Sequence, residues 1–469
     1  MQSPSDTKES APISAGKPVR AFWKHLGLGT GGAVENSFQN APLTMGNPIY
    51  NVGLGVDPVM VGVAMALPRI WELFLDPLIG TVSDRTRSRY GRRLPYMVLG
   101  LLGSFLFFVA MWWAPAGWSK ESLGIWLIVT AILFYTFYSF FAIPYAAITI
   151  EASEAGPDRI GVMTTRTAFA NLSSIAISWL YWGCQRDCFP SPAEGMKWVG
   201  LGFGIIVTLC GIVVVATALK NGLHLHSVHE GKVPVTKGNY RNLLRLGSMR
   251  CIVIALFSTM IGCTMVGHLG FYLVAYYACR GNLKAAALVM ALKATIATIT
   301  AVIACPFIGA AAKRFGKDRV FKVLLIVGVL SSLSMWVLIT PHNPYLSIIG
   351  DMGVALCLVG FWLLMPAYLG DVSDYYEKTT GQSCQGMLTA LYGIAVKIGA
   401  SLALLTTGYI LVFCGFHADM PLEAMGHPIF NMRILFAIVP SLGLALSLVA
   451  MSRFRIDLAM QSGEEKSTA

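Results

Sequence analysis

Long apolar segments, separated by short polar ones, fill most of this chain of 469 residues. Each is long enough to cross a bilayer as a helix, which takes about 20 mostly apolar residues. Hydrophobic residues make up 55% of the chain and charged residues only 13%, well below the roughly 25% of soluble domains. The sequence therefore predicts an all-helical integral membrane protein with twelve transmembrane helices, at about 27–50, 57–82, 95–114, 123–150, 163–184, 198–219, 251–278, 285–311, 320–340, 345–370, 385–415 and 432–452.

The longest polar segment between two predicted helices, residues 220–250, divides them into six and six. Its composition is typical of a cytoplasmic linker. We therefore expect one six-helix bundle over residues 27–219 and a second over residues 251–452. Residues 1–26 and 453–469 form polar cytoplasmic tails in this interpretation.

The net charge of +11 is compatible with nucleic-acid binding, but the positions of the basic residues argue against it. If both termini lie in the cytoplasm, most Lys and Arg residues fall in segments on the inner side. This asymmetry is the positive-inside pattern of membrane proteins. It predicts a plasma-membrane protein with no surplus basic patch for DNA or RNA. The basic residues expected on the outer side are Lys120, Arg186, Lys197, Arg280, Lys284 and Arg433.

The segment RIWELFLDP places Arg69, Glu72 and Asp76 inside the second predicted helix. A charged side chain at the bilayer centre costs at least roughly 2.5–3.5 kcal/mol, so such residues usually pair with one another or line an ion or substrate path. Glu72 and Asp76 are four positions apart and share one helix face. They are therefore the first candidates for a cation site. The sequence gives no specific role to three other polar residues inside predicted helices, Glu35, His268 and Asp351.

A short motif recurs after the second and the eighth predicted helices, at equivalent positions of the two halves. A glycine precedes a tight basic turn with an aspartate, which resembles the inner-loop signature of the major facilitator superfamily. Topology signals explain the basic charges but not the repeated glycine spacing. We expect ion pairs here that latch neighbouring helices on the cytoplasmic face and break during conformational change. The predicted latch residues are Gly80, Asp84, Arg85, Arg92, Gly309, Arg314 and Asp318.

The RIWELFLDP segment is one of several motifs that together extend over nearly the whole chain. The others are the basic loop DRTRSRYGRR, the segment AIPYAAI, Arg166, and GDVSDYYEKTTG followed by Lys397. Together they resemble the glycoside-pentoside-hexuronide:cation symporter family, which includes melibiose permease. The resemblance implies a secondary active transporter that imports a sugar, glycoside or hexuronide with H⁺ or Na⁺ by alternating access. We expect a monomer in the lipid bilayer that is not an enzyme and needs no cofactor or metal.

The resemblance also assigns roles to individual residues. Asp76 matches the family's helix 2 aspartate before proline, Glu72 replaces an aspartate one turn earlier, and Lys397 matches a lysine that pairs with these carboxylates. Asn36 falls near a sugar-binding aspartate, and Arg166 matches a sugar-site arginine. The implied cation-coupling residues are Glu72, Asp76, Ser139 and Lys397, and the implied substrate-binding residues are Asn36, Tyr138, Arg166 and Trp362.

Three positions depart from the family pattern and leave the coupling ion and the cargo open. Ala142 and Leu75 stand where melibiose permease has an aspartate and an asparagine, so H⁺ and Na⁺ both stay open. Ala146 replaces a sugar-contacting tryptophan, so galactoside specificity is not transferred. The alternatives are a transporter of the same fold for another cargo, such as a lysolipid, and a sugar sensor that does not transport.

Other patterns in the chain do not add an activity. Gly27, Gly29 and Gly32 satisfy G-x-G-x-x-G, but no strand precedes them, which argues against dinucleotide binding. The sequence contains no Ser/His/Asp set and no Walker loop, so neither an enzyme nor an ATP-driven pump is predicted. Cys184 and Cys188 fall in a predicted outer loop, where a disulfide is an open alternative.

Overall fold

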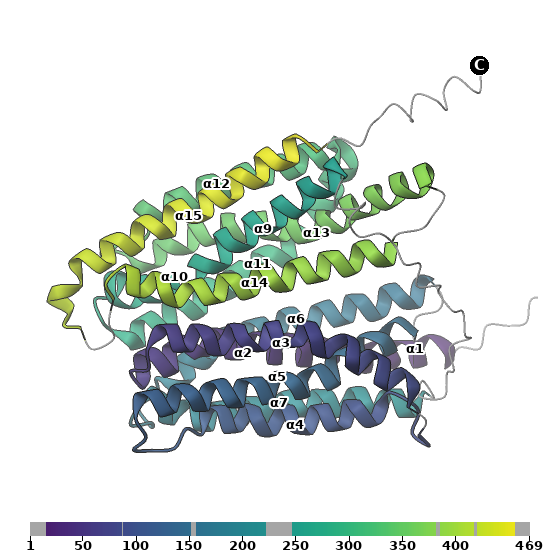
Figure 1. The fold of residues 1–469 in the computed structure, drawn as a ribbon, viewed down its shortest axis with the longest axis horizontal. Helices are drawn as coiled ribbons and strands as arrows, with labels where there is room; N and C mark the ends of the chain where they lie inside the picture. Colours follow the sequence, from purple (N-terminus) through teal and green to yellow (C-terminus); the bar gives the residue numbers. More distant parts are fainter. Residues whose placement is uncertain are drawn as a thin grey trace, which may run out of the picture.

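Every regular element in the described part of the chain is a helix. Ten of these helices are long and apolar enough to cross a membrane. Figure 1 shows the helices of residues 16–221 on one side of the molecule and those of residues 246–454 on the other, which we call the N-terminal half and the C-terminal half. The computed structural model describes residues 16–86, 88–151, 156–221, 246–380, 385–416 and 420–454, so most of both predicted tails and of the predicted linker lies outside it.

The helices of the N-terminal half follow one another with short connections. Helix α3 begins where the Asp57 carboxylate accepts hydrogen bonds from the backbone N–H groups of Val59 (2.7 Å) and Met60 (3.3 Å). Pro58 occupies the first helical position, where its missing N–H is not needed. The elements are α1 (Gly16–Gly29), α2 (Gly31–Gly46), the π-helix η1 (Asn47–Gly53), α3 (Pro58–Arg85), α4 (Leu94–Trp112), α5 (Lys120–Glu151), α6 (Gly156–Cys184) and α7 (Pro192–Lys220).

The C-terminal half is built in the same way. Helix α11 begins where the Asn282 side chain accepts a hydrogen bond from the N–H of Ala285 at 3.0 Å. Its elements are α9 (Gly247–Gly267), α10 (Leu269–Tyr272), the π-helix η3 (Leu273–Ala278), α11 (Leu283–Phe315), α12 (Lys317–Leu338), the 3₁₀ turn η4 (Pro344–Leu346), α13 (Ser347–Thr380), α14 (Gln385–Phe413), the 3₁₀ turn η5 (Leu422–Met425) and α15 (Gly426–Ser452).

Two of the twelve predicted spans do not appear among the ten strongly apolar helices. They are the first, which the structure divides into α1, α2 and η1, and the fifth, which lies in α6. Both carry polar residues that face each other: the Asn36 amide in α2 donates to Ser173 Oγ and Ser174 Oγ in α6, each at 2.9 Å. The mean hydropathy of these two helices is low because they contain polar side chains. These side chains are tolerated between the helices because they form hydrogen bonds with one another.

Polar contacts join the two halves at the end of the molecule opposite the last residues of α15. Tyr272 Oη donates to Asn51 Oδ1 at 2.7 Å, and Trp179 Nε1 donates to Thr295 Oγ1 at 3.0 Å. The hydrophobic core of the N-terminal half also continues into the buried residues of α10 and η3 at this end. The halves are therefore packed against each other there.

The loop between α6 and α7 contributes a further contact between the halves at the same end. The exposed Asp187 carboxylate accepts a hydrogen bond from the Lys284 ammonium, and this contact holds the pKa of Asp187 below its ordinary value. Cys184 is buried and Cys188 is exposed, and both are free thiols. The disulfide left open by the sequence is not formed.

Helices α3 and α14 approach each other closely across the boundary between the halves. A Cβ built on Gly408 would lie 2.5 Å from the carbonyl oxygen of Pro58, and one built on Gly62 would lie 3.1 Å from that of Leu404. These oxygens belong to the backbone and cannot swing away. A glycine at position 408 is therefore needed for this arrangement of the two halves.

Gly408→Val is expected to open this end of the protein. Overpacking typically costs about 1–3 kcal/mol, so the closed arrangement should become at least about fivefold less populated. The measurement is the disulfide yield between cysteines placed at Asn51 and Tyr272, in a chain without its native cysteines. Gly202→Val in α7 is the matched control, because a Cβ there meets nothing within 4 Å. Equal yields in both variants would contradict the expectation.

Candidate functional site

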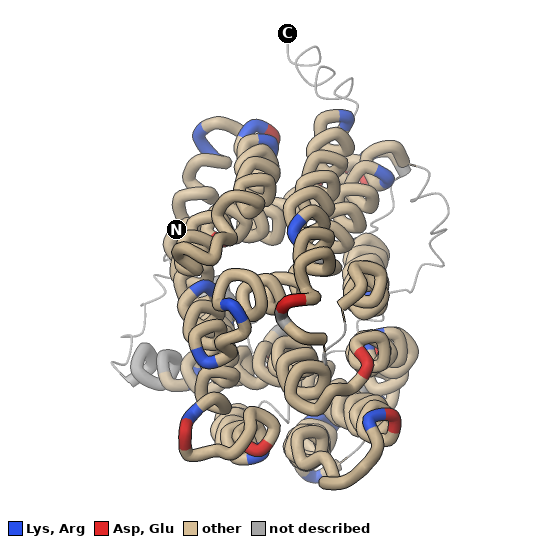
Figure 2. The backbone as a smooth tube through the Cα atoms, turned by 90° about the vertical axis from the view of Figure 1, so that its left-hand side faces the viewer, with Lys and Arg blue, Asp and Glu red and all other residues tan. Residues whose placement is uncertain are grey.

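Four charged side chains from opposite halves form one group, which we call the charge cluster. Arg69, Glu72 and Asp76 come from α3, and Lys397 comes from α14. Arg69 Nη1 and Lys397 Nζ lie 3.2 Å and 3.8 Å from Glu72 Oε2. Lys397 also donates to Asp76 Oδ2. Figure 2 shows that most of the helical backbone carries uncharged residues.

Arg69 is held on several sides. Its side chain is almost fully buried, and Nη2 donates to the backbone carbonyl of Gln39 at 2.8 Å and to Tyr135 Oη at 3.3 Å. The guanidinium also lies 4.4 Å from the centre of the Tyr135 ring, within cation–π range. These contacts hold Arg69 beside Glu72, whose side chain is also buried.

Asp76 is the member of the charge cluster with a free ligand atom. Its Oδ1 is buried and has no hydrogen-bond partner among the described residues, whereas Oδ2 accepts a hydrogen bond from Lys397. Two cations balance two carboxylates in this cluster, so an added cation must compete with Lys397 for Asp76. Ser139, predicted to complete the site, is buried in α5. Among the described residues, no hydrogen bond joins Ser139 to either carboxylate.

A second ion pair joins α2 to α6. Arg166 Nε and Nη2 both donate to Glu35 Oε2, at 3.0 Å and 2.5 Å, and Tyr138 Oη donates to the Glu35 backbone carbonyl at 3.3 Å. Gly32 permits this packing, because a Cβ there would lie 2.1 Å from the carbonyl oxygen of Arg166. Both charged side chains keep about a quarter of their surface exposed. They can therefore be reached by a polar ligand.

The structure places Glu35 at this site, although the sequence gave it no role. The signal in the sequence was its position inside an apolar helix, which marks an acidic residue as functional but does not name its partner. The side chain of its neighbour Asn36, predicted to bind sugar, already forms hydrogen bonds within the protein. Besides two α6 hydroxyls, its amide donates to the Ala170 carbonyl at 3.0 Å, and its Oδ1 accepts from Asn40 at 2.9 Å. In this conformation Asn36 joins α2 to α6.

Of the four predicted substrate residues, Trp362 stands apart. Tyr138 and Arg166 meet at Glu35, whereas Trp362 lies in α13 of the C-terminal half, partly exposed and edge-on to Phe361. The structure thus brings together the residues from the N-terminal half only. Asp351, also in α13, has a partner that the sequence did not show: Lys293 Nζ lies 2.8 Å from its Oδ2. This pair lines a separate cavity of about 210 Å³ within the C-terminal half.

Of the predicted latch residues, Asp318 forms a hydrogen bond that joins neighbouring helices. Asp318 accepts a hydrogen bond from Tyr368 Oη at 2.7 Å, and the neighbouring Lys317 pairs with Asp371, so α12 is tied to α13. Gly309, predicted as a latch residue, makes no close approach to another described helix, because a Cβ there would meet nothing within 4 Å. A Cβ on Gly80 would be in ordinary contact with Ile143, at 3.8 Å. Of the remaining latch residues, Arg85, Arg92 and Arg314 lie at helix ends or in the loop after α3, and the side chain of Asp84 is outside the described part.

The sequence profile of the family described as MFS/sugar transport protein matches residues 27–458. The chain belongs to this family. The sequences of two relatives align with most of this member of the MFS/sugar transport family. The putative glycoside/cation symporter YagG of Escherichia coli (strain K12) is 23% identical over 441 residues, which is 92% of this chain and 91% of that protein. The isoprimeverose transporter of Lactiplantibacillus pentosus is 23% identical over 418 residues, 87% of this chain and 83% of that protein.

Solved structures have the same fold. The crystal structure of a D-xylose-proton symporter matches with a TM-score of 0.63 at 12% identity, over 93% of this chain and 98% of that one. The all-helical major facilitator fold predicted from the sequence is thereby confirmed, as is the resemblance to the glycoside-pentoside-hexuronide:cation symporters. This member of the MFS/sugar transport family is a multi-span membrane transporter.

Proposed function

We propose that this chain is a secondary active transporter, and not an enzyme, that carries a sugar or glycoside together with H⁺ or Na⁺. The link from Lys397 in α14 to the two carboxylates in α3 carries the proposal. It is a contact between the two halves, and it is made by the groups best suited to bind a cation. Binding of the cation and movement of the halves are therefore coupled through one side chain.

The coupling step follows from the charges. A proton or Na⁺ at Asp76 removes the attraction for Lys397 and releases α14 from α3. Glu72 stays neutralised by Arg69 on its own helix, so the exchange is confined to Asp76 and Lys397. Oxygen ligands suit Na⁺, and a carboxylate can alternatively take the proton itself. Ser139 would supply a hydroxyl once the cluster rearranges.

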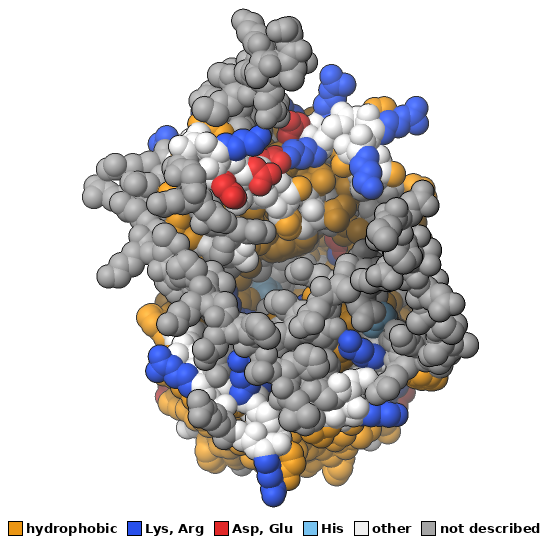
Figure 3. Space-filling view, turned by 90° about the vertical axis from the view of Figure 1, so that its right-hand side faces the viewer, with side chains coloured by type: hydrophobic (Ala, Val, Ile, Leu, Met, Phe, Trp, Pro, Cys, Tyr) orange, Lys and Arg blue, Asp and Glu red, His pale blue; other side chains and the backbone are white. Residues whose placement is uncertain are grey.

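The proposed architecture is the full major facilitator arrangement of twelve spans in two six-helix bundles. The ten apolar helices among the described residues support this proposal, and α1 to η1 and α6 would supply the two remaining spans. Both termini would then be cytoplasmic. Figure 3 looks onto the end of the molecule at which α15 ends, where a hollow lies between the described side chains of the two halves. We take this as the cytoplasm-facing state of a carrier that alternates by rocking of the halves.

The cargo would bind at Glu35, Arg166 and Tyr138. An arginine and a carboxylate can together donate to and accept from the hydroxyl groups of a sugar. Because Glu35 already neutralises Arg166, a uronate would have to displace a bound carboxylate. The pair therefore favours neutral sugars and glycosides over hexuronides. Trp362 would join this site from the C-terminal half only when the halves close around the cargo.

Glu35→Gln is expected to shift selectivity toward uronates. Arg166 would lose its carboxylate partner and become free to bind one on the cargo. The ratio of glucuronide to glucoside uptake should rise about tenfold, which corresponds to about 1.4 kcal/mol. Competition of each compound against a labelled glycoside in vesicles measures the ratio. Glu35→Asp keeps the charge and serves as the control, and an unchanged ratio in Glu35→Gln would refute the assignment.

The proposed function is tested with the purified chain in sealed vesicles, offered a panel of glycosides and uronides. An inward Na⁺ gradient at equal pH, or a pH gradient without Na⁺, should drive accumulation of at least one of them. Accumulation under one gradient alone identifies the ion. Sugar binding without counterflow would indicate a sensor, and competition by lysolipids but not by sugars would indicate a lipid cargo.

A further inference from the structure

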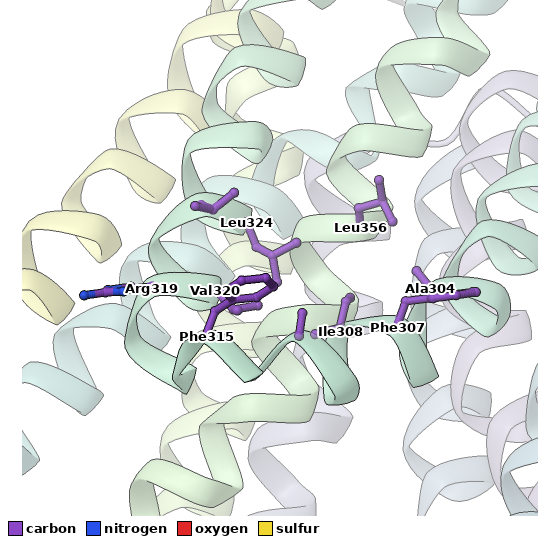
Figure 4. A pocket seen from close by; sticks show the side chains of 10 residues that line it. Ala304, Phe307, Ile308, Phe315, Arg319, Val320, Leu324 and Leu356 are labelled. Carbon is purple, nitrogen blue, oxygen red and sulfur yellow. The ribbon is translucent and has the colours of Figure 1, made fainter. Parts of the chain in front are cut away.

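An apolar groove runs between α11 and α12 on the outside of the C-terminal half. It has a volume of about 570 Å³ and a floor formed by Leu356 of α13. Figure 4 shows Arg319 at one side of the groove and Ala304 and Phe307 at the other. Arg319 is the only charged residue in its lining, which consists of Ala304, Phe307, Ile308, Ala311, Phe315, Arg319, Val320, Val323, Leu324 and Leu356.

The length of the groove matches one leaflet of a bilayer. It extends along α11 from Phe315, beside the turn into α12, to Ala304. These residues are eleven positions apart, which corresponds to about 16 Å at 1.5 Å per helical residue. Half of the roughly 30 Å hydrocarbon core is about 15 Å. The groove thus has the depth of a single lipid tail.

The turn at the head of the groove carries unneutralised positive charge. Its Asp318 accepts a hydrogen bond from Tyr368, and Lys317 pairs with Asp371, so both are engaged with α13. Arg319 and Lys322, one helical turn apart on α12, have no ion pair or hydrogen bond with any other described side chain. Arg319 therefore presents a guanidinium to whatever fills the groove.

We propose that an anionic phospholipid of the bilayer binds here, with one acyl chain in the groove and its phosphate on Arg319 and Lys322. Guanidinium groups suit phosphate oxygens because they donate two parallel hydrogen bonds. Basic pockets between helices at the cytoplasmic membrane surface are a recognised setting for such headgroups. Burial of the acyl chain gives affinity, and the two cations give selectivity for a negative headgroup. The lipid would bridge α11 and α12 next to the ties between α12 and α13.

The test is native mass spectrometry of the full chain in detergent, titrated with phosphatidylglycerol or phosphatidylcholine of identical acyl chains. The wild-type chain should bind one phosphatidylglycerol about tenfold more tightly than phosphatidylcholine. The double variant Arg319→Gln/Lys322→Gln should abolish this preference and leave residual binding of both lipids. Ala311→Phe fills the groove and should weaken the binding of both.

Two control variants change residues outside the proposed lipid site. Arg453→Gln removes an exposed basic residue at the end of α15, and Val337→Phe enlarges an exposed apolar residue outside the groove. Both should bind lipid like the wild type. Equal binding of the two lipids by the wild type, or an unchanged preference in the double variant, would overturn the proposal. So would displacement of the lipid by a transported glycoside, or a dimer that Ala311→Phe dissociates.

Discussion

Asp76→Asn should abolish accumulation of cargo against its gradient while exchange of cargo across the membrane continues. The substitution keeps the shape of the side chain but removes the negative charge, so neither a proton nor Na⁺ is held there. Lys397 also loses its principal partner, and α14 is released from α3 whether or not a cation is present. Gradient-driven uptake should fall to the level of empty vesicles, whereas counterflow should retain a substantial part of its rate.

The measurement compares both assays on one preparation of vesicles. Glu194→Gln, which removes a carboxylate whose partner Lys197 lies on the same helix α7, is the control and should leave accumulation intact. Loss of counterflow together with accumulation would show a folding or cargo-binding defect instead. Normal accumulation by Asp76→Asn would remove Asp76 from the coupling mechanism.

Arg69→Met should be among the most destabilising substitutions in the chain. It leaves the buried Glu72 carboxylate with Lys397 at 3.8 Å as its remaining charged partner, and it strips the Gln39 carbonyl of a hydrogen bond. Removal of one partner of a buried ion pair typically costs about 3–5 kcal/mol. The thermal midpoint of the purified protein in one detergent is the measurement.

A second substitution separates this effect from simple loss of packing. Arg69→Met/Glu72→Leu removes both charges and should recover most of the lost stability, because no uncompensated carboxylate remains. Arg453→Met, at an exposed helix end, should match the wild type. A single variant as stable as Arg453→Met, or a double variant less stable than the single one, would contradict this account of the charge cluster.

The sequence predicted the all-helical membrane fold and two of the side chains that meet in the charge cluster. Long apolar segments predicted the membrane helices, and the spacing of Glu72 and Asp76 placed both on one face of α3. The resemblance supplied Lys397, which lies more than 300 positions away and in the other half. The hydropathy signal for a membrane span is weakest for helices α2 and α6, because both contain polar side chains. Those side chains form hydrogen bonds with one another, which the sequence does not show.

The remaining part of the site depends on which helix faces meet, and no periodicity shows that. Glu35 and Arg166 are each recognisable as unusual, but only the packing of α2 on α6 makes them a pair. The same holds for Lys293 and Asp351. For Asn36, predicted to bind sugar, the sequence likewise did not show that its amide donates to two hydroxyls of α6.

The balance of two positive and two negative side chains in the charge cluster has an electrical consequence. In the proposed alternating-access cycle, the empty carrier moves this region between its two orientations without net charge, whereas the carrier loaded with a cation moves it with one positive charge. The membrane potential should therefore act on the loaded step and leave the return step unaffected. Each elementary charge that crosses the full field gains about 2.3 kcal/mol per 100 mV. Voltage would thus supply part of the work of accumulation even where the concentration of the coupling ion is equal on both sides.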